Sequence, residues 1–323
     1  MKTPALSVSN LRIWFESGLN RNHAVDNISF NVLPGEATGL VGESGCGKSM
    51  TALAILGLLP AAGIKTSCSS IKVNGIEISR LSQAQRRDIL GRDIAMIFQQ
   101  PGTALDPVFT IGSLIGATYR RHFGGSKQVI RQAVCESLES VGFKDPGQIA
   151  ATYPHQLSGG MRQLAMIAMA TICKPAVIIA DEPTTSLDSA TRSIILQQLA
   201  RLQKSHQTAV LMISHDLGVI RQNCNQVLVM YCGRLVEKTD SQHLFAHARH
   251  PYSAGLVSCI PQINVQQGSS LASIPGQVPT ADRLPPGCHF APRCTRARPV
   301  CDEAAPELDD AQGVGVACFR PLS

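Results

Sequence analysis

Residues 42–49 read GESGCGKS, between the apolar run 38–41 and the helix-prone run 50–56. Glycines let a backbone curl until its N–H groups face a phosphate, while a lysine adds a cation and a serine hydroxyl can ligate Mg²⁺. Strand, glycine-rich loop and helix, in this order, predict a phosphate-binding loop in an α/β fold. The contacts to nucleotide expected here are Gly42, Ser44, Gly45, Cys46, Gly47, Lys48, Ser49 and Met50.

A second glycine-rich turn, LSGGM, occupies residues 157–161. A phosphate loop alone would leave open kinases, small GTPases and helicases. A second such turn at the start of a helix offers another cluster of backbone N–H groups for an anion. Ser158, Gly159 and Gly160 are therefore predicted to bind a phosphate, so the chain carries two anion-binding parts.

Three further apolar runs end in polar side chains. Residues 177–180 lead into Asp181 and Glu182, residues 94–98 into Gln99, and residues 209–214 into His215. Short apolar runs of this kind indicate buried parallel strands, whose carboxyl ends meet the ligand. Asp181 and Gln99 are predicted Mg²⁺ ligands beside Ser49, and Glu182 is predicted to polarise the attacking water.

Each of these assignments has a structural alternative. Glu182 is otherwise a supporting residue or an acid at a helix start, Gln99 a solvent-facing amide, and His215 a structural histidine. Their common placement at strand ends favours the functional interpretation.

Taken in order, these motifs resemble the ATP-binding-cassette (ABC) family from about Leu6 to Glu237, with residues 186–188 as its D-loop. The resemblance implies a RecA-like α/β P-loop ATPase core with an antiparallel β lobe and a helical subdomain at about 100–165, all within 1–245. It also implies that two cassettes face each other, with ATP held between one phosphate loop and the other's Ser158, Gly159 and Gly160. In this family Glu182 and His215 would be catalytic, and Phe15 is the best candidate to stack on adenine, with Trp14 or His23 as alternatives.

Composition fits such a motor. The 323 residues allow one α/β core and a smaller appendage, the net charge of +6 is modest, and no basic run with interleaved aromatics indicates nucleic-acid binding. No apolar run reaches the ~20 residues of a spanning helix, and no secretory signal is expected at the start of the chain. The resemblance therefore implies two separate membrane permease subunits, a second ATPase subunit and, indirectly, an extracytoplasmic solute-binding protein. The chain would lie on the cytoplasmic face of the bacterial inner membrane.

Four of the eleven cysteines, Cys288, Cys294, Cys301 and Cys318, lie near the end of the chain. Disulfides are disfavoured for a cytosolic chain. Four thiolates suit a soft metal or an iron–sulfur cluster, although close zinc-knuckle spacings are absent, and four unrelated buried thiols remain the alternative.

Residues 246–323 resemble the carboxyl extension of the oligopeptide, dipeptide and nickel importers, through RHPYS at 249–253 and GCHFAPRC at 287–294. In dipeptide-type members the four cysteines hold a 4Fe–4S cluster, so the resemblance implies one here, with Zn²⁺ as the second choice. Arg293 and Arg298 would offset cluster charge or be surface cations.

The resemblance implies an ATPase that drives import of dipeptides or oligopeptides. A nickel or metal-chelate importer is the first alternative. A soluble ABC ATPase that acts on nucleic acid is a weaker alternative, because the sequence has neither a second cassette nor a long coiled coil. An iron–sulfur sensor with a secondary ATPase activity is a third alternative.

Overall fold

The computed structural model describes residues 3–17, 20–60, 62–185, 187–260, 273–308 and 314–322. They form two compact units, each built from several stretches of chain. The first comprises Met1–Ser7, Asn31–Ala37 and Ile71–Met212, and the second comprises Val8–Phe30, Thr38–Ser70 and Ile213–Ser323. The predicted boundary at 245/246 is a different division and stays a prediction.

The first unit contains strands and most of the long helices. Its strands are β5 (Ser70–Val73), β6 (Ile76–Glu77), β7 (Ile94–Ile97), β8 (Val177–Asp181) and β9 (Ala209–Ile213). Its helices are α2 (Gln83–Ile89), α3 (Pro101–Ala104), α4 (Ile111–Phe123), α5 (Lys127–Ser140), α6 (Pro146–Ala151), α7 (Gly159–Thr171) and α8 (Ser189–His206).

The strands of the first unit follow the predicted apolar runs. Strands β7 and β8 pair in parallel, with Ile94 opposite Val177, and β9 continues the order β9-β8-β7. Every residue of β8 and β9 is buried, as expected where helices cover both faces of a parallel sheet. Strands β5 and β6 form a hairpin at Asn74-Gly75, a pair of residues that favours tight turns, and both have positive φ (48° and 80°).

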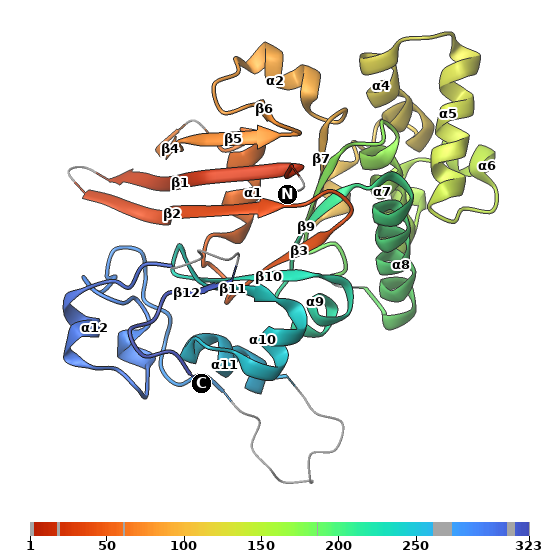
Figure 1. Cartoon of the computed structure of the whole chain (residues 1–323). Helices are drawn as coiled ribbons and strands as arrows, with labels where there is room; N and C mark the ends of the chain where they lie inside the picture. Colours follow the sequence, from red (N-terminus) through yellow and green to blue (C-terminus); the bar gives the residue numbers. More distant parts are fainter. Residues whose placement is uncertain are drawn as a thin grey trace. The chain divides into compact units, whose positions relative to one another are not determined.

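The predicted helical subdomain is α3 to α7. Thr110 and Ser126 cap α4 and α5 by accepting hydrogen bonds from the N–H groups of Ser113 and Val129. Figure 1 shows α4, α5 and α6 grouped together, with α7 packed against α4 and α5.

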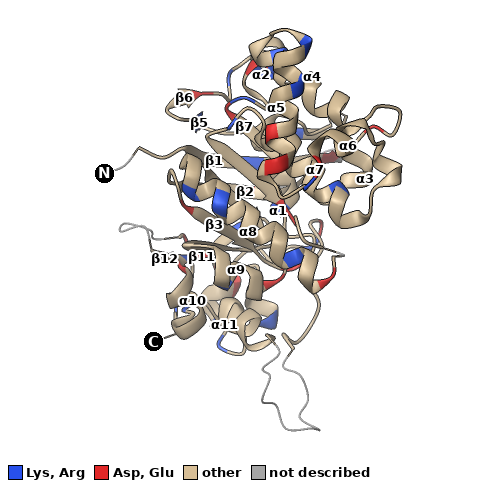
Figure 2. Cartoon of the chain, turned by 90° about the vertical axis from the view of Figure 1, so that its right-hand side faces the viewer, with Lys and Arg blue, Asp and Glu red and all other residues tan. Residues whose placement is uncertain are grey.

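Basic residues of this unit lie in the last turns of α2 and α4 (Figure 2). Cations at a helix C-terminus face the negative end of the helix dipole. Arg121 also pairs with Asp88 at 3.3 Å. These cations therefore have a local role in stabilising helix ends.

The second unit carries the two long N-terminal strands and the end of the chain. Its strands are β1 (Leu6–Ser17), β2 (Asn20–Val32), β3 (Ala37–Val41), β4 (Ile64–Ser67), β10 (Gln226–Tyr231), β11 (Arg234–Asp240) and β12 (Gly315–Val316). Its helices are α1 (Lys48–Leu56), α9 (Leu217–Asn223), α10 (Ser241–His247), α11 (Pro251–Ser258) and α12 (Pro299–Glu303).

Strand order in the second unit is β12-β11-β10-β3. Strand β10 runs parallel to β3 and antiparallel to β11, which in turn pairs antiparallel with β12, so the sheet is mixed. Strands β1 and β2, which belong to the predicted antiparallel lobe, pair with each other, and β4 pairs antiparallel with β1, with Phe15 opposite Ile64. After α11, residues 261–272 lie outside the described part of the chain, and residues 273–287 contain neither helix nor strand.

No helix in the described part of the chain is both long enough and apolar enough to cross a membrane.

Candidate functional site

The phosphate loop lies in the second unit, between β3 and α1, as predicted. All five residues of β3 are buried. Gly47 precedes α1 with φ 107°, and a Cβ there would lie 2.5 Å from the carbonyl oxygen of Ala24, so only glycine fits this turn. Ser44, Gly45 and Ser49 are exposed on the loop and accessible to a ligand.

Lys48 is buried at the base of this loop. Its Nζ donates to the carbonyl oxygens of Gly42 at 2.8 Å and Glu43 at 2.9 Å, and it lies 3.5 Å from the Sγ atom of Cys46. Burial raises the pKa of the Cys46 thiol. A neutral, buried thiol is unreactive, so Cys46 acts in the loop as a small side chain.

The predicted catalytic carboxylate lies in the first unit, directly after β8. Asp181 ends the strand and is buried, and Glu182 follows with a left-handed backbone (φ 46°). The amide Nε2 of Gln99 and the hydroxyl of Thr185 each donate to Oε2 of Glu182, both at 2.9 Å. The structure thus brings Gln99 and Glu182 together, a contact that the sequence did not predict.

The LSGGM turn opens α7 as predicted. Ser158 is the N-cap residue, and its hydroxyl accepts a hydrogen bond from the N–H of Met161 at 3.3 Å. Space beyond Gly159 is open, since nothing lies within 4 Å of a Cβ built there, whereas Gly160 packs against Thr191 of α8. Asp188 caps α8 and accepts hydrogen bonds from Thr191, while its neighbour Ser186 lies outside the described residues.

Two predicted residues lie in the second unit apart from the loop motif. His215 is exposed between β9 and α9. Phe15 is 38% exposed near the end of β1. Both positions leave the side chain available to a ligand.

The four C-terminal cysteines line one small cavity of the second unit. Three of the sulfur atoms accept backbone N–H groups at 3.4 to 3.5 Å, namely those of Cys294, Cys301 and Cys318. Yet no group of three or more His, Cys, Asp or Glu side chains among the described residues could hold a metal ion. Although the four cysteines line one cavity, their arrangement therefore supports neither the predicted 4Fe–4S cluster nor its zinc alternative.

Arg293 is not the surface cation that the sequence allowed. Its side chain is 3% exposed and pairs with Glu43 of the phosphate loop at 2.8 Å. Local sequence did not indicate this ion pair, because Arg293 and Glu43 are 250 residues apart.

The ABC transporter family model matches residues 25–185, and the model of the C-terminal region of oligopeptide/dipeptide transporters matches residues 236–301. The oligopeptide transport ATP-binding protein AppD of Bacillus subtilis is 42% identical over 97% of this chain and 96% of its own length. The dipeptide transport ATP-binding protein DppD of Escherichia coli is 41% identical over 98% and 97%.

Among solved structures, a dimeric ATP-binding cassette in a post-hydrolysis state bound to ADP and Pi matches with a TM-score of 0.65 and 26% identity, over 73% of this chain and 98% of that one. A cassette of the cbiONQ ABC transporter complex of Clostridium perfringens matches with a TM-score of 0.64 and 25% identity, over 76% and 92%.

Proposed function

The chain belongs to the ABC transporter family, in its oligopeptide/dipeptide branch, and on that premise we propose that it is the ATP-hydrolysing subunit of an importer for dipeptides or oligopeptides. The oligopeptide and dipeptide transport ATP-binding proteins compared above align over more than nine-tenths of this chain. A nickel or metal-chelate importer is the alternative.

The observation that carries the hydrolytic role is the held carboxylate after β8. Gln99 and Thr185 both donate to Oε2 of Glu182, which orients the carboxylate. A carboxylate fixed beside a Mg²⁺ ligand can polarise a water for attack on a γ-phosphate. In this proposal the Mg²⁺ that accompanies ATP would be coordinated by Asp181, Gln99 and Ser49.

The phosphate loop supplies positioning and positive charge. Its backbone N–H groups and Lys48 would hold the β- and γ-phosphates, and His215 would contact the γ-phosphate. Phe15 would stack on adenine. Phosphoryl transfer requires little more from a protein than positioning and charge neutralisation.

The proposed active unit is a dimer of cassettes. Ser158, Gly159 and Gly160 would bind the ATP held by a second ATPase subunit, and the open space at Gly159 supports this role. A solved relative is dimeric with ADP and Pi. ATP would then shift the cassettes toward a closed pair, and hydrolysis would release it.

The transport partners follow from the same proposal. Two permease subunits would cross the membrane, a solute-binding protein would deliver the peptide outside, and this chain would act on the cytoplasmic face of the bacterial inner membrane. No nucleic-acid partner is proposed.

We also propose that Cys288, Cys294, Cys301 and Cys318 hold a 4Fe–4S cluster. All four side chains line one cavity, and cysteine thiolates are the groups that would hold such a cluster. Burial raises the pKa values of Cys288 and Cys318, and both thiols would have to lose their protons to bind the cluster. When bound, the cluster would supply a covalent cross-link to a segment with little core of its own.

The cluster proposal is tested by anaerobic purification with iron, sulfide and zinc analysis. About four irons per chain are expected, with loss of iron in Cys301→Ser and retention in Cys135→Ser. Stoichiometric zinc without iron would contradict the proposal.

The transport proposal is tested by reconstituting the chain with its permeases and second cassette in proteoliposomes. ATP hydrolysis is expected to rise when peptide-loaded binding protein is added, together with uptake of labelled dipeptide. Stimulation by a nickel-loaded binding protein and not by a peptide-loaded one would favour the alternative.

A further inference from the structure

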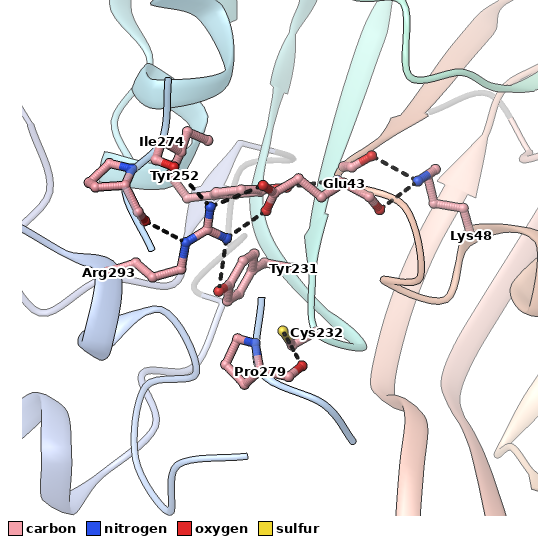
Figure 3. Close-up of polar contacts among 10 residues, drawn as sticks. Glu43, Lys48, Tyr231, Cys232, Tyr252, Ile274, Pro279 and Arg293 are labelled. Carbon is pink, nitrogen blue, oxygen red and sulfur yellow. Dashed lines mark hydrogen bonds and ion pairs between the residues drawn. The ribbon is translucent and has the colours of Figure 1, made fainter. Parts of the chain in front are cut away.

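A buried arginine of the C-terminal extension lies against the phosphate loop. Nη1 of Arg293 donates to Oε2 of Glu43 at 2.8 Å, and Nη2 donates to Oε1 at 3.0 Å (Figure 3). The contact is a two-point fork, and the side chains are 3% and 27% exposed. A bidentate arginine–carboxylate pair of this kind fixes direction as well as distance.

The rest of the guanidinium is also held. Nε donates to the carbonyl oxygen of Pro275 at 2.9 Å, and Nη1 also contacts the hydroxyl of Tyr231 at 3.3 Å. The rings of Tyr231 and Phe290 lie 5.8 and 5.9 Å from the guanidinium carbon. Hydrogen bonding to Glu43 raises the pKa of Arg293 further above its usual value. Arg293 is therefore a fixed, permanently charged partner for the loop.

Glu43 is anchored through its main chain as well. Its N–H donates to the hydroxyl of Tyr252 in α11 at 2.8 Å, and its carbonyl accepts Nζ of Lys48 at 2.9 Å. The same residue thus connects two side chains from beyond residue 250 to the lysine that the phosphate loop presents (Figure 3). A displacement of the Arg293 side chain would therefore change the position of Lys48 through Glu43.

Charge gives this contact a role beyond packing. Glu43 is the only acid among residues 42–49, a stretch that must accept a triphosphate. An unpaired carboxylate there would repel the ligand, and Arg293 neutralises it.

We propose that Arg293 is a positioning residue of the nucleotide site: through Glu43 it holds the phosphate loop in its ATP-binding shape and cancels the charge of the loop's only carboxylate. The proposal rests on the function proposed above, in which residues 42–49 bind ATP. The C-terminal extension is then part of the ATP site of its own chain.

The test measures ATP hydrolysis by the full transporter with Arg293→Met, Glu43→Gln and the double variant. The loop touches ATP alike in the ground and transition states, so we expect Arg293→Met to raise the KM for ATP about tenfold with kcat within about twofold. Adding Glu43→Gln should lower the KM of Arg293→Met by roughly threefold or more, because the repelling carboxylate is gone.

Matched variants separate this role from general stability. Arg293→Lys keeps the charge without the fork and should give a KM between wild type and Arg293→Met. Arg283→Met removes an arginine of the same segment whose side chain is 85% exposed, and it should leave the KM unchanged. Binding of a fluorescent ATP analogue to each variant provides a readout that does not need turnover.

A normal KM for ATP in Arg293→Met would overturn the proposal, and so would a lower kcat and a lower melting temperature with the KM unchanged. Additive effects of Arg293→Met and Glu43→Gln on the KM in the double variant would also overturn it. Lys48→Ala separates failure of this inference from failure of the proposed function. If Lys48→Ala still binds ATP normally, the assignment of residues 42–49 fails. If Lys48→Ala loses ATP and Arg293→Met does not, only the role of Arg293 fails.

Discussion

Glu182 adopts a left-handed backbone that a glutamate rarely occupies, with φ 46°. Such a conformation costs of order 1–3 kcal/mol and persists where surrounding contacts hold it, often at functional sites. Gln99 and Thr185 supply those contacts to the carboxylate. Strand β8 thus brings Glu182 to the edge of the sheet, and its left-handed backbone sets the direction of the side chain.

We expect Glu182→Gln to bind ATP and to lose nearly all turnover, because the amide cannot polarise water as the carboxylate does. Loss of one preorganised group of this kind costs about 3 kcal/mol of transition-state stabilisation, or roughly 10²-fold in kcat. Steady-state ATPase assays and equilibrium ATP binding measure both effects. Glu139→Gln, on the exposed face of α5, is the control, and near-normal turnover in Glu182→Gln would remove the catalytic assignment.

Buried thiols should be inert at neutral pH. Burial raises the pKa of Cys224 to about 12 and that of Cys173 to about 11. Alkylation requires the thiolate, whose fraction grows as the pH approaches the pKa from below, so at pH 8 both thiols stay protonated.

Iodoacetamide at pH 8 should therefore modify Cys224 and Cys173 only after unfolding, whereas the partly accessible Cys135 reacts in the native protein. Peptide mass spectrometry of native and unfolded samples measures each site. Rapid labelling of Cys224 in the native protein would contradict this prediction, because it would show that the end of α9 opens readily.

At the scale of elements, local sequence predicted well what each segment becomes. Ser158 caps α7 and Asn74-Gly75 makes a hairpin turn, because caps and tight turns depend on a few adjacent residues. The predicted helical region and the buried strands also formed. What local sequence did not show is that the start of α7 packs against α8 through Gly160 and Thr191.

Gly160→Ala should destabilise the protein by about 1–3 kcal/mol, because its Cβ would overlap the Cγ2 atom of Thr191. Gly159→Ala is the matched control: its Cβ meets open space, and it should leave stability within about 1 kcal/mol of wild type. Urea unfolding measures both.

Thr191→Ser should rescue Gly160→Ala. It removes the overlapping methyl group and keeps the hydroxyl that donates to Asp188 at 2.7 Å. Equal free energies of unfolding for Gly160→Ala and Gly159→Ala would contradict the prediction, because α7 and α8 could then move apart without loss of stability.

At the scale of the whole molecule, the proposed ATP-dependent pairing is open to direct measurement. Glu182→Gln should double in mass on addition of MgATP, alone or with its paralogous mate, because ATP binds and is not consumed. Analytical ultracentrifugation detects the change. Adding Gly159→Asp places a negative charge at the start of α7 in open space, so it should leave the fold intact and abolish pairing through repulsion of the partner's ATP.

The sequence by itself determined the local units: the phosphate loop, the capped helix after Ser158, the strand that delivers Asp181 and Glu182, and the family that this order of motifs indicates. These depend on backbone preferences and apolar patterns within a few residues. Only the tertiary structure decided that Gln99 contacts Glu182 across 83 residues and that Arg293 pairs with Glu43 across 250. Such contacts depend on how distant segments pack. An arginine and a carboxylate gain little free energy by pairing in water, so they meet where burial of their apolar neighbours brings them together.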